Sequence, residues 1–350
     1  MRRAGQGAGV IAQPSASVQD IGDATDVSAV AGYLAGLYER HLATDEGAVA
    51  TYIPELSGVD PSLFGICLAT VDGSVYEAGD ARVPFTIQSM SKPLTYGLAL
   101  ERLGREAVRR RIGVEPSGDA FNAIFFDPST NRPYNPMVNA GAITVAGIVH
   151  DVAGAGAFEL IIERLSAAAG RNLTMDEAVY RSEAETGHRN RAIGHLLRNV
   201  GALSGAVDPV VDLYFRQCSI LVTAADLARM GATLAHLGEN PMTGRQVFDL
   251  TAVRNTLAVM FTCGMYDYSG NWAYDVGVPA KSGVGGGIVG VVNRQLGIGT
   301  FSPRLDAKGN SVRGVAAIKE IGNELGLHVF DCSNFGSTFM RSMLDEPAGG

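Results

Sequence analysis

The chain is organised around one stretch, Phe85-Thr86-Ile87-Gln88-Ser89-Met90-Ser91-Lys92-Pro93. Ser89 and Lys92 are three residues apart, so on a helix their side chains lie on one face and can hydrogen-bond. The apolar run 94–103 predicts that helix, and Pro93 is tolerated in its first turn but not in its interior. Because proline also restricts the residue before it, we expect the first turn to be irregular.

A serine hydroxyl beside an amine is a known arrangement for acyl transfer, since the amine can take the proton while the oxygen attacks a carbonyl carbon. The chain has only four lysines among its 28 basic residues, at positions 92, 281, 308 and 319. Arginine cannot give up its proton in a protein and lysine can, so a general base must be lysine even in a chain that prefers arginine. The alternative interpretation is that Ser89 caps the helix and Lys92 is a solvated charge.

The composition is that of a water-soluble globular protein with one or two domains. Of 350 residues, 46% are hydrophobic and only 18% are charged, and the net charge of −8 argues against a nucleic-acid-binding surface. No window approaches the roughly 18 uninterrupted apolar residues of a membrane span. Residues 1–20 lack the apolar core of a signal peptide, so we expect a disordered extension and a cytoplasmic protein.

The cysteines and histidines do not form a metal-binding pattern. The four cysteines are scattered without a Cys-x-x-Cys spacing, and the six histidines form no His-x-x-x-His pair. We therefore expect reduced thiols and no metal site.

The periodicity of apolar residues predicts strands near both ends of the chain and helices between them. A first helix follows Thr25 and Asp26, and strands at 64–71 and 74–78 flank Asp72-Gly73, which is typical of a two-residue hairpin loop. Further strands are predicted at 272–276, 288–292 and 296–301, before a last helix at 311–325. The central helices are predicted at 139–149, 157–169, 190–200, 208–217 (capped by Asp208 with Pro209 first), 223–237 and 251–261.

This order predicts an α+β fold in one domain, residues 21–345, before a short loose tail. An antiparallel sheet would be built from the N- and C-terminal segments and covered by the terminal helices, with a helical lobe at about 89–263 inserted between them. The layout brings residues near 90 and near 281 into one neighbourhood.

Two familiar functional motifs find no support in the sequence. Gly285-x-Gly287-x-x-Gly290 matches a dinucleotide-binding fingerprint, but a strand and not a helix follows it, so we interpret the glycines as sites of close backbone approach. The chain also contains no Gly-x-Ser-x-Gly nucleophile elbow.

A third motif supports the Ser89–Lys92 pair. Lys281-Ser282-Gly283 matches the Lys-Ser/Thr-Gly element that accompanies Ser-x-x-Lys in penicillin-interacting serine enzymes. Both elements occur in the expected order and use two of the four lysines.

Blocks along the chain from about 52 to 330 resemble the serine-dependent glutaminases. The resemblance implies a β-lactamase/transpeptidase-like fold, hydrolysis of L-glutamine to L-glutamate and ammonia without a cofactor, and a homodimer or homotetramer. The blocks are Tyr52-Ile53-Pro54, Val83-Pro84-Phe85, Gln88-Ser89-Met90-Ser91-Lys92-Pro93, Glu115-Pro116-Ser117-Gly118, Asn135-Pro136-Met137-Val138-Asn139-Ala140-Gly141-Ala142, Arg189-Asn190, Cys263-Gly264-Met265-Tyr266-Asp267 and Pro279-Ala280-Lys281-Ser282-Gly283.

The resemblance also implies a set of site residues. Ser89 would be the nucleophile and Lys92 the general base, with Lys281 and burial lowering the pKa of Lys92. The substrate pocket would be formed by Tyr52, Ser89, Asn139, Glu183, Asn190, Tyr214, Tyr266 and Val284.

Chemistry makes these assignments reasonable. The α-ammonium of glutamine requires a carboxylate, which Glu183 or, alternatively, Glu185 could supply. Asn139, Asn190 and tyrosine hydroxyls would bind the α-carboxylate, although Tyr214 could instead be a core residue. The backbone amides of Ser89 and Val284 would form the oxyanion hole, and Tyr266 would pass a proton to the departing ammonia.

Two rival functions use the same residues differently. A penicillin-binding or β-lactamase-like enzyme would need an export signal, and a glutamine-sensing module would not need the complete set Ser89, Lys92 and Lys281. The loop Gly118–Phe125, with Phe121 and Phe125, resembles the gating loop of the family.

Overall fold

A five-stranded antiparallel sheet lies at the centre of the fold, with strand order β2-β1-β9-β8-β7. The computed structural model describes residues 25–118, 124 and 126–331. The first two strands come from the N-terminal part and the other three from the C-terminal part, as predicted. Their bounds are β1 Gly65–Thr70, β2 Val75–Gly79, β7 Ala280–Ser282, β8 Gly287–Val292 and β9 Leu296–Phe301.

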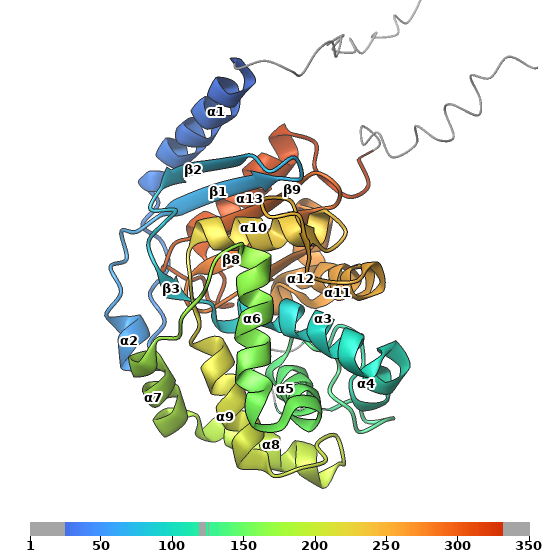
Figure 1. Cartoon of the computed structure of the whole chain (residues 1–350). Coiled ribbons are helices and arrows are strands. Elements are labelled where there is room, and N and C mark those ends of the chain that lie inside the picture. The colour runs from blue at the N-terminus through green and yellow to red at the C-terminus, as the bar shows by residue number, and fades with distance from the viewer. Residues whose placement is uncertain (1–24, 119–123, 125, 332–350) are drawn as a thin grey trace, which may run out of the picture.

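Helices cover both faces of this sheet (Figure 1). On one face, α1 (Thr25–Leu42) and α13 (Val312–Glu324) pack with Ile288 and Ile298 in one apolar cluster. On the other face, α10 (Ala224–Ala235) lies between the sheet and the helical lobe. A Cβ atom at Gly299 would lie 1.9 Å from the carbonyl oxygen of Ala224, so glycine at this position allows α10 to approach β9 closely.

The inserted lobe is helical, as predicted. Its main helices are α3 (Ser91–Leu103), α4 (Arg105–Arg111), α5 (Asn139–Ala153), α6 (Ala157–Ala169), α7 (Glu177–Thr186), α8 (His188–Asn199), α9 (Val207–Cys218) and α11 (Leu250–Cys263). Within the lobe, α3 packs against α4, α5, α6 and α11. Smaller elements are α2 (Pro54–Ser57), α12 (Ser269–Asp275), the 3₁₀ turns η1 (Gln88–Met90), η2 (Gly154–Gly156) and η3 (Tyr266–Tyr268), and the pairs β3 (Phe85–Thr86) with β4 (Leu221–Val222) and β5 (Glu239–Asn240) with β6 (Arg245–Gln246).

The predicted strand at 272–276 is wrong, because this segment forms α12. Trp272 and Val276 are buried while Tyr274 between them is 86% exposed. A strand would have turned all three side chains to one face, whereas a helix separates the first and fifth residues from the third.

Two local predictions need smaller corrections. The hairpin at Asp72-Gly73 exists, but its loop has three residues: Thr70 and Ser74 pair, and Gly73 alone has a positive φ (93°). The helix predicted to begin behind Asp208 begins at Val207, so Asp208 lies in the first turn instead of capping it.

One continuous helical run, Asn139–Ala169, is long and apolar enough to cross a membrane by length and composition alone. It consists of α5, η2 and α6, and most of α5 is buried within the lobe. Core helices of soluble proteins meet the same criterion, so the run is weak evidence for a membrane span.

Cys67, Cys218 and Cys263 are buried free thiols, as expected, and Cys332 lies outside the described residues. The predicted disordered extension at 1–20, the tail at 345–350, Phe121 and Phe125 also lie outside them.

Candidate active site

Ser89 lies in η1, in the turn that joins β3 to α3. The pairing of β3 with β4 and the bond from Ile87 N to Ile220 O (2.8 Å) fix the start of this turn. Gln88 has a φ of 48°, a left-handed conformation that costs a non-glycine residue roughly 1–3 kcal/mol. The irregular turn lies at Gln88–Met90, as a 3₁₀ turn directly before α3, whereas Lys92, at which Pro93 predicted the irregularity, lies within α3.

Lys92 is the second residue of α3 and is only 1% exposed. Its Nζ donates to Asn139 Oδ1 (2.7 Å) and to Met137 O (3.3 Å). The segment before α5 packs closely onto this helix, because a Cβ at Gly141 would lie 1.9 Å from Asn135 O. Burial lowers the pKa of Lys92 to about 8, which leaves roughly a tenth of the amine neutral at pH 7.

Lys281 lies in β7 on the other side of the site and is fully buried. Its Nζ donates to Gly264 O (2.9 Å) and Ser282 O (2.7 Å) and lies 3.9 Å from the centre of the Tyr266 ring. Burial, and then the charge of Lys92, lower the pKa of Lys281 well below its usual value. The prediction that the two lysines lie in one neighbourhood is confirmed. The charge repulsion lowers the pKa of Lys281, however, whereas the pKa of Lys92 is lowered by burial and not by Lys281.

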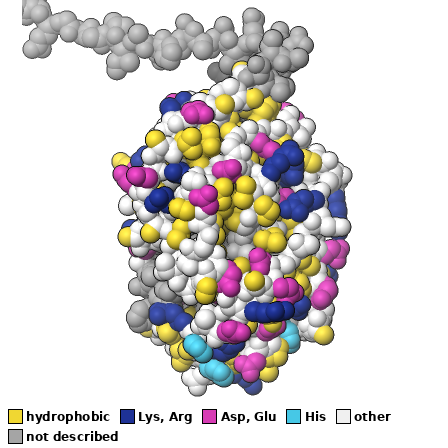
Figure 2. Space-filling model, turned by 90° about the vertical axis from the view of Figure 1, so that its left-hand side faces the viewer, with side chains coloured by type: hydrophobic (Ala, Val, Ile, Leu, Met, Phe, Trp, Pro, Cys, Tyr) yellow, Lys and Arg dark blue, Asp and Glu magenta, His cyan; other side chains and the backbone are white. Residues whose placement is uncertain are grey.

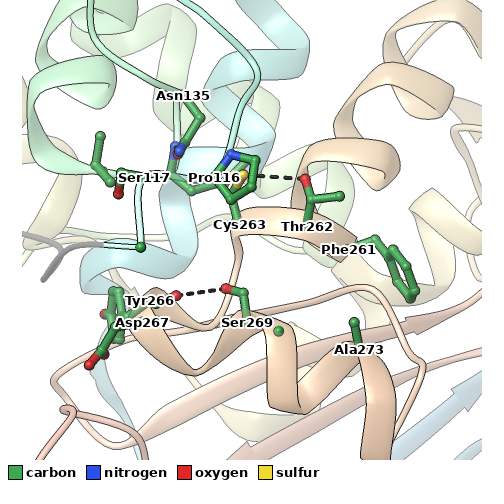
Figure 3. Close-up of a pocket in the computed structure, with 14 residues that line it drawn as sticks. Pro116, Ser117, Asn135, Phe261, Thr262, Cys263, Tyr266, Asp267, Ser269 and Ala273 are labelled. Carbon is green, nitrogen blue, oxygen red and sulfur yellow. Dashed lines mark hydrogen bonds between the residues drawn. The ribbon is translucent and has the colours of Figure 1, made fainter. Parts of the chain in front are cut away.

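Tyr266 reaches the same centre from η3, with a φ of 58°. Its hydroxyl donates to Ser282 O (3.0 Å), and burial raises its pKa to about 12, an effect that a hydrogen bond with Ser89 partly offsets. Ser269 Oγ donates to Tyr266 O (2.8 Å) and holds the turn, as Figure 3 shows. The cavity in that view, of about 260 Å³, lies on the side of Tyr266 that faces Cys263 and Pro116 and is not lined by Ser89.

A second cavity of about 420 Å³ lies directly over Ser89. Seven of the predicted pocket residues line it, and Tyr266, the eighth, is linked to it through Ser89. The lining residues are Tyr52, Gln88, Ser89, Asn139, Glu183, Thr186, Gly187, Arg189, Asn190, Tyr214, Cys218 and Val284.

Glu183 provides a buried carboxylate in this cavity and is 6% exposed. Burial raises its pKa to about 6, and hydrogen bonds with Gln88 and Tyr52 oppose the shift. Although 48% of the Tyr52 surface is exposed, its hydroxyl lies inside, between Gln88 Oε1 (3.1 Å) and Glu183 Oε1 (3.4 Å). The alternative candidate Glu185 is exposed on α7 and does not line the cavity.

Three helices bring amide and hydroxyl groups to the wall of the cavity. Asn139 begins α5, and its Oδ1 accepts from Tyr214 OH (3.3 Å) as well as from Lys92. Its Nδ2 donates to Asn190 Oδ1 (3.0 Å) on α8. Tyr214 is buried, but its hydroxyl belongs to this polar group, so it is more than a core residue.

Val284 completes the cavity beside Ser89. It follows β7 in a tight turn closed by the bond from Gly286 N to Gly283 O (2.9 Å). The glycine motif that begins here leads into strand β8, as predicted, and a Cβ at Gly287 would lie 2.5 Å from Met90 Cε. Close packing against the η1 turn therefore explains that glycine.

Sequence reasoning missed Gln88 and Cys218 in the cavity wall. Cys218 lies one helical turn after Tyr214 on α9, so the i, i+4 spacing could have indicated it. Gln88 directly precedes Ser89, but its left-handed backbone leaves no mark in the sequence.

The described residues contain no group of three or more His, Cys, Asp or Glu side chains that could hold a metal ion. On the face in Figure 2, basic and acidic side chains are interspersed. Metal independence and the absence of nucleic-acid binding stay predictions.

Comparisons with known proteins match most of the chain to glutaminases. The family model described as Glutaminase matches residues 47–330. Glutaminase 1 of Bradyrhizobium diazoefficiens is 56% identical over 83% of this chain and 48% of its own length, so the chain spans about half of that relative. A glutaminase of Nostoc sp. is 50% identical over 86% of this chain and 90% of its own. A solved structure of Mglu in its glutamate form, 44% identical, has a TM-score of 0.84 and is matched over 88% of this chain and 72% of that one.

Proposed function

Because the chain belongs to the glutaminase family, we propose that it hydrolyses L-glutamine to L-glutamate and ammonia through a glutamyl ester on Ser89. The observation that carries the proposal is that one cavity is lined by Ser89 and also by Glu183, Asn139 and Asn190. A site that hydrolyses glutamine needs a nucleophile for the side-chain amide, and charges or dipoles of opposite sign for the α-ammonium and the α-carboxylate.

The α-groups of glutamine would be bound by residues of the helical lobe. The ammonium would pair with Glu183, whose carboxylate is buried and otherwise held by neutral groups. The carboxylate would receive the amide hydrogens of Asn190, which uses its oxygen to accept from Asn139 Nδ2. Tyr214 would turn its hydroxyl, which otherwise donates to Asn139 Oδ1, toward the same carboxylate.

Lys92 would act as the base for Ser89. A neutral amine has two N–H bonds and one lone pair, and the acceptors Asn139 Oδ1 and Met137 O take both N–H bonds. The lone pair is then left for the Ser89 hydroxyl proton. The Ser89 oxygen attacks the side-chain carbonyl carbon, and the backbone amides of Ser89 and Val284 stabilise the oxyanion.

Tyr266 would deliver the proton that ammonia needs to leave. Its hydroxyl lies beside Ser89 and donates to Ser282 O before the reaction. The proton would turn to the leaving nitrogen, and the tyrosinate would regain a proton from protonated Lys92. Water then hydrolyses the ester with the same groups in reverse order, and Ser89 regains its proton.

Several broader features belong to the same proposal. We assign the fold to the β-lactamase/transpeptidase-like type, on the strength of the antiparallel sheet with its inserted helical lobe. Residues 21–345 would form one catalytic domain that needs no metal or organic cofactor and works in the cytoplasm. A homodimer or homotetramer that binds neither nucleic acid nor membranes is the expected assembly.

A coupled assay for ammonia tests the function. We expect release from L-glutamine far above release from L-asparagine, whose shorter side chain cannot reach Ser89 while its α-groups are bound. Equal release from both amino acids, or release from neither, would contradict the proposal.

A further inference from the structure

The strained residue before the nucleophile is held from outside the cavity. The carbonyl oxygen of Gln88 accepts two hydrogen bonds from Ser91, one from its N–H and one from its hydroxyl at 2.7 Å. Ser91 Oγ accepts in turn from Gln217 Nε2 at 2.9 Å. Ser91 and Gln217 are 0% and 1% exposed, and neither lines the cavity over Ser89.

The conformation of Gln88 decides where Ser89 lies. A residue with a side chain tends to leave the left-handed region, and the rotation of the next peptide unit would then displace Ser89. The side chain of Gln88 is tied to the substrate cavity: its Oε1 accepts from Tyr52 OH (3.1 Å) and its Nε2 donates to Thr86 Oγ1 (3.3 Å). The side chain of Gln88 is thus fixed within the cavity, and Ser91 fixes its backbone carbonyl.

We propose that Ser91 and Gln217 are positioning residues for the reaction, and that the hydrogen-bond relay Gln217 Nε2 to Ser91 Oγ to Gln88 O keeps Ser89 in register with Lys92. This inference rests on the proposed function. Gln217 lies three residues after Tyr214 on α9, so one helix holds both the nucleophile turn and a group assigned to the substrate carboxylate.

The direction of the relay matters. Gln217 Oε1 is buried and has no hydrogen-bond partner among the described residues, while Nε2 donates to Ser91. If an oxygen faced Ser91 instead, the Ser91 hydroxyl would donate to it and Gln88 O would lose that donor. Gln217→Glu creates this case, whereas Gln217→Met only removes the donor and leaves the bond from Ser91 Oγ to Gln88 O.

The test compares kcat and KM for glutamine in Ser91→Ala and in a matched control, Ser219→Ala. Ser219 is equally buried, and its hydroxyl also donates to a backbone carbonyl, Phe215 O at 2.9 Å, but outside the nucleophile turn. We expect Ser91→Ala to lower kcat about tenfold to a hundredfold, since small displacements of a reacting group have effects of this size. Its KM should stay within about twofold, because the groups assigned to the substrate's α-ends do not move.

A purely structural hydrogen bond would give a different pattern. It would lower the melting temperature of both variants and leave both values of kcat near that of the wild type, which would overturn the inference. An equal loss of kcat in the control would also overturn it.

Position 217 provides an independent series if Ser91→Ala does not fold. We expect Gln217→Glu to lose more kcat than Gln217→Met, and equal kcat in the two variants would contradict the relay. Absence of ammonia release from the wild type would overturn the proposed function and this inference together, whereas an active wild type with an equally active Ser91→Ala would overturn this inference alone.

Discussion

Replacing Glu183 by glutamine should weaken glutamine binding strongly while the cavity keeps its shape. The amide is isosteric with the carboxylate and can still accept from Tyr52 OH, so the main loss is the negative charge facing the substrate ammonium. Removing one partner of a buried charge pair costs about 3–5 kcal/mol. Because the cavity is open to solvent before binding, we take the lower end, about 3 kcal/mol, which corresponds to roughly a hundredfold in kcat/KM.

Steady-state kinetics with an ammonia assay measure this change. The loss should appear mainly as a higher KM, because the ammonium is bound in the ground state and the transition state alike. The matched control is Glu185→Gln, on the same helix but exposed, which should change kcat/KM by less than about twofold. If Glu183→Gln kept wild-type kcat/KM, or Glu185→Gln lost activity instead, the assignment of the ammonium site would be refuted.

The same carboxylate should limit activity in acid. Burial raises the pKa of Glu183 to about 6, and only the ionised form pairs with an ammonium. In the wild type, the fall of kcat/KM that Lys92 causes below about pH 8 should therefore become steeper below about pH 6, and this steepening should be absent in Glu183→Gln. The same steepening in the variant would assign that titration to another group.

Three further predictions concern the reaction centre and its selectivity. Burial lowers the pKa of Lys92 to about 8, and only the neutral amine can take a proton, so kcat/KM should rise with pH through an apparent pKa near 8. This titration belongs to the coupled Ser89–Lys92–Lys281 group. Lys92→Arg should be inactive at every pH, and substantial activity in that variant would remove Lys92 as the base. Tyr266→Phe should lower kcat about a hundredfold, the usual range for a lost proton donor, with KM little changed, and a wild-type kcat would leave proton delivery to Lys92. Penicillin should leave no stable adduct in intact-mass spectrometry, and a penicilloyl mass on the protein would favour the penicillin-interacting alternative.

The parts of the fold that follow a regular period could be predicted from the sequence. The strands near 66, 290 and 298 and the helices between them were found because apolar residues repeat at intervals of two or of three to four over many positions. The short segment 272–276 was misassigned because five residues, with Trp272 and Tyr274 two apart, fit a strand as well as one turn of helix. Elements fixed by long-range contacts, such as the pair β3–β4, have too few residues to show any period.

The candidate site was predictable to the extent that its residues carry chemistry in short motifs. Ser89, Lys92 and Lys281 could be brought together by topology alone, since strands from both ends of the chain share one sheet. The conformation of Gln88 and its support by Gln217 could not, because a left-handed φ at a glutamine and a contact across 126 positions depend on the whole packed structure.

The covalent intermediate tests the central claim most directly. The protein is mixed with glutamine, quenched in acid during the first turnover, digested and analysed by peptide mass spectrometry, with Ser89→Ala as the control. We expect the mass of one glutamyl group on the peptide that contains Ser89, and no such mass in the control. A glutamyl group on another side chain, or ammonia release in the first turnover with Ser89 unmodified at every quench time, would contradict the mechanism.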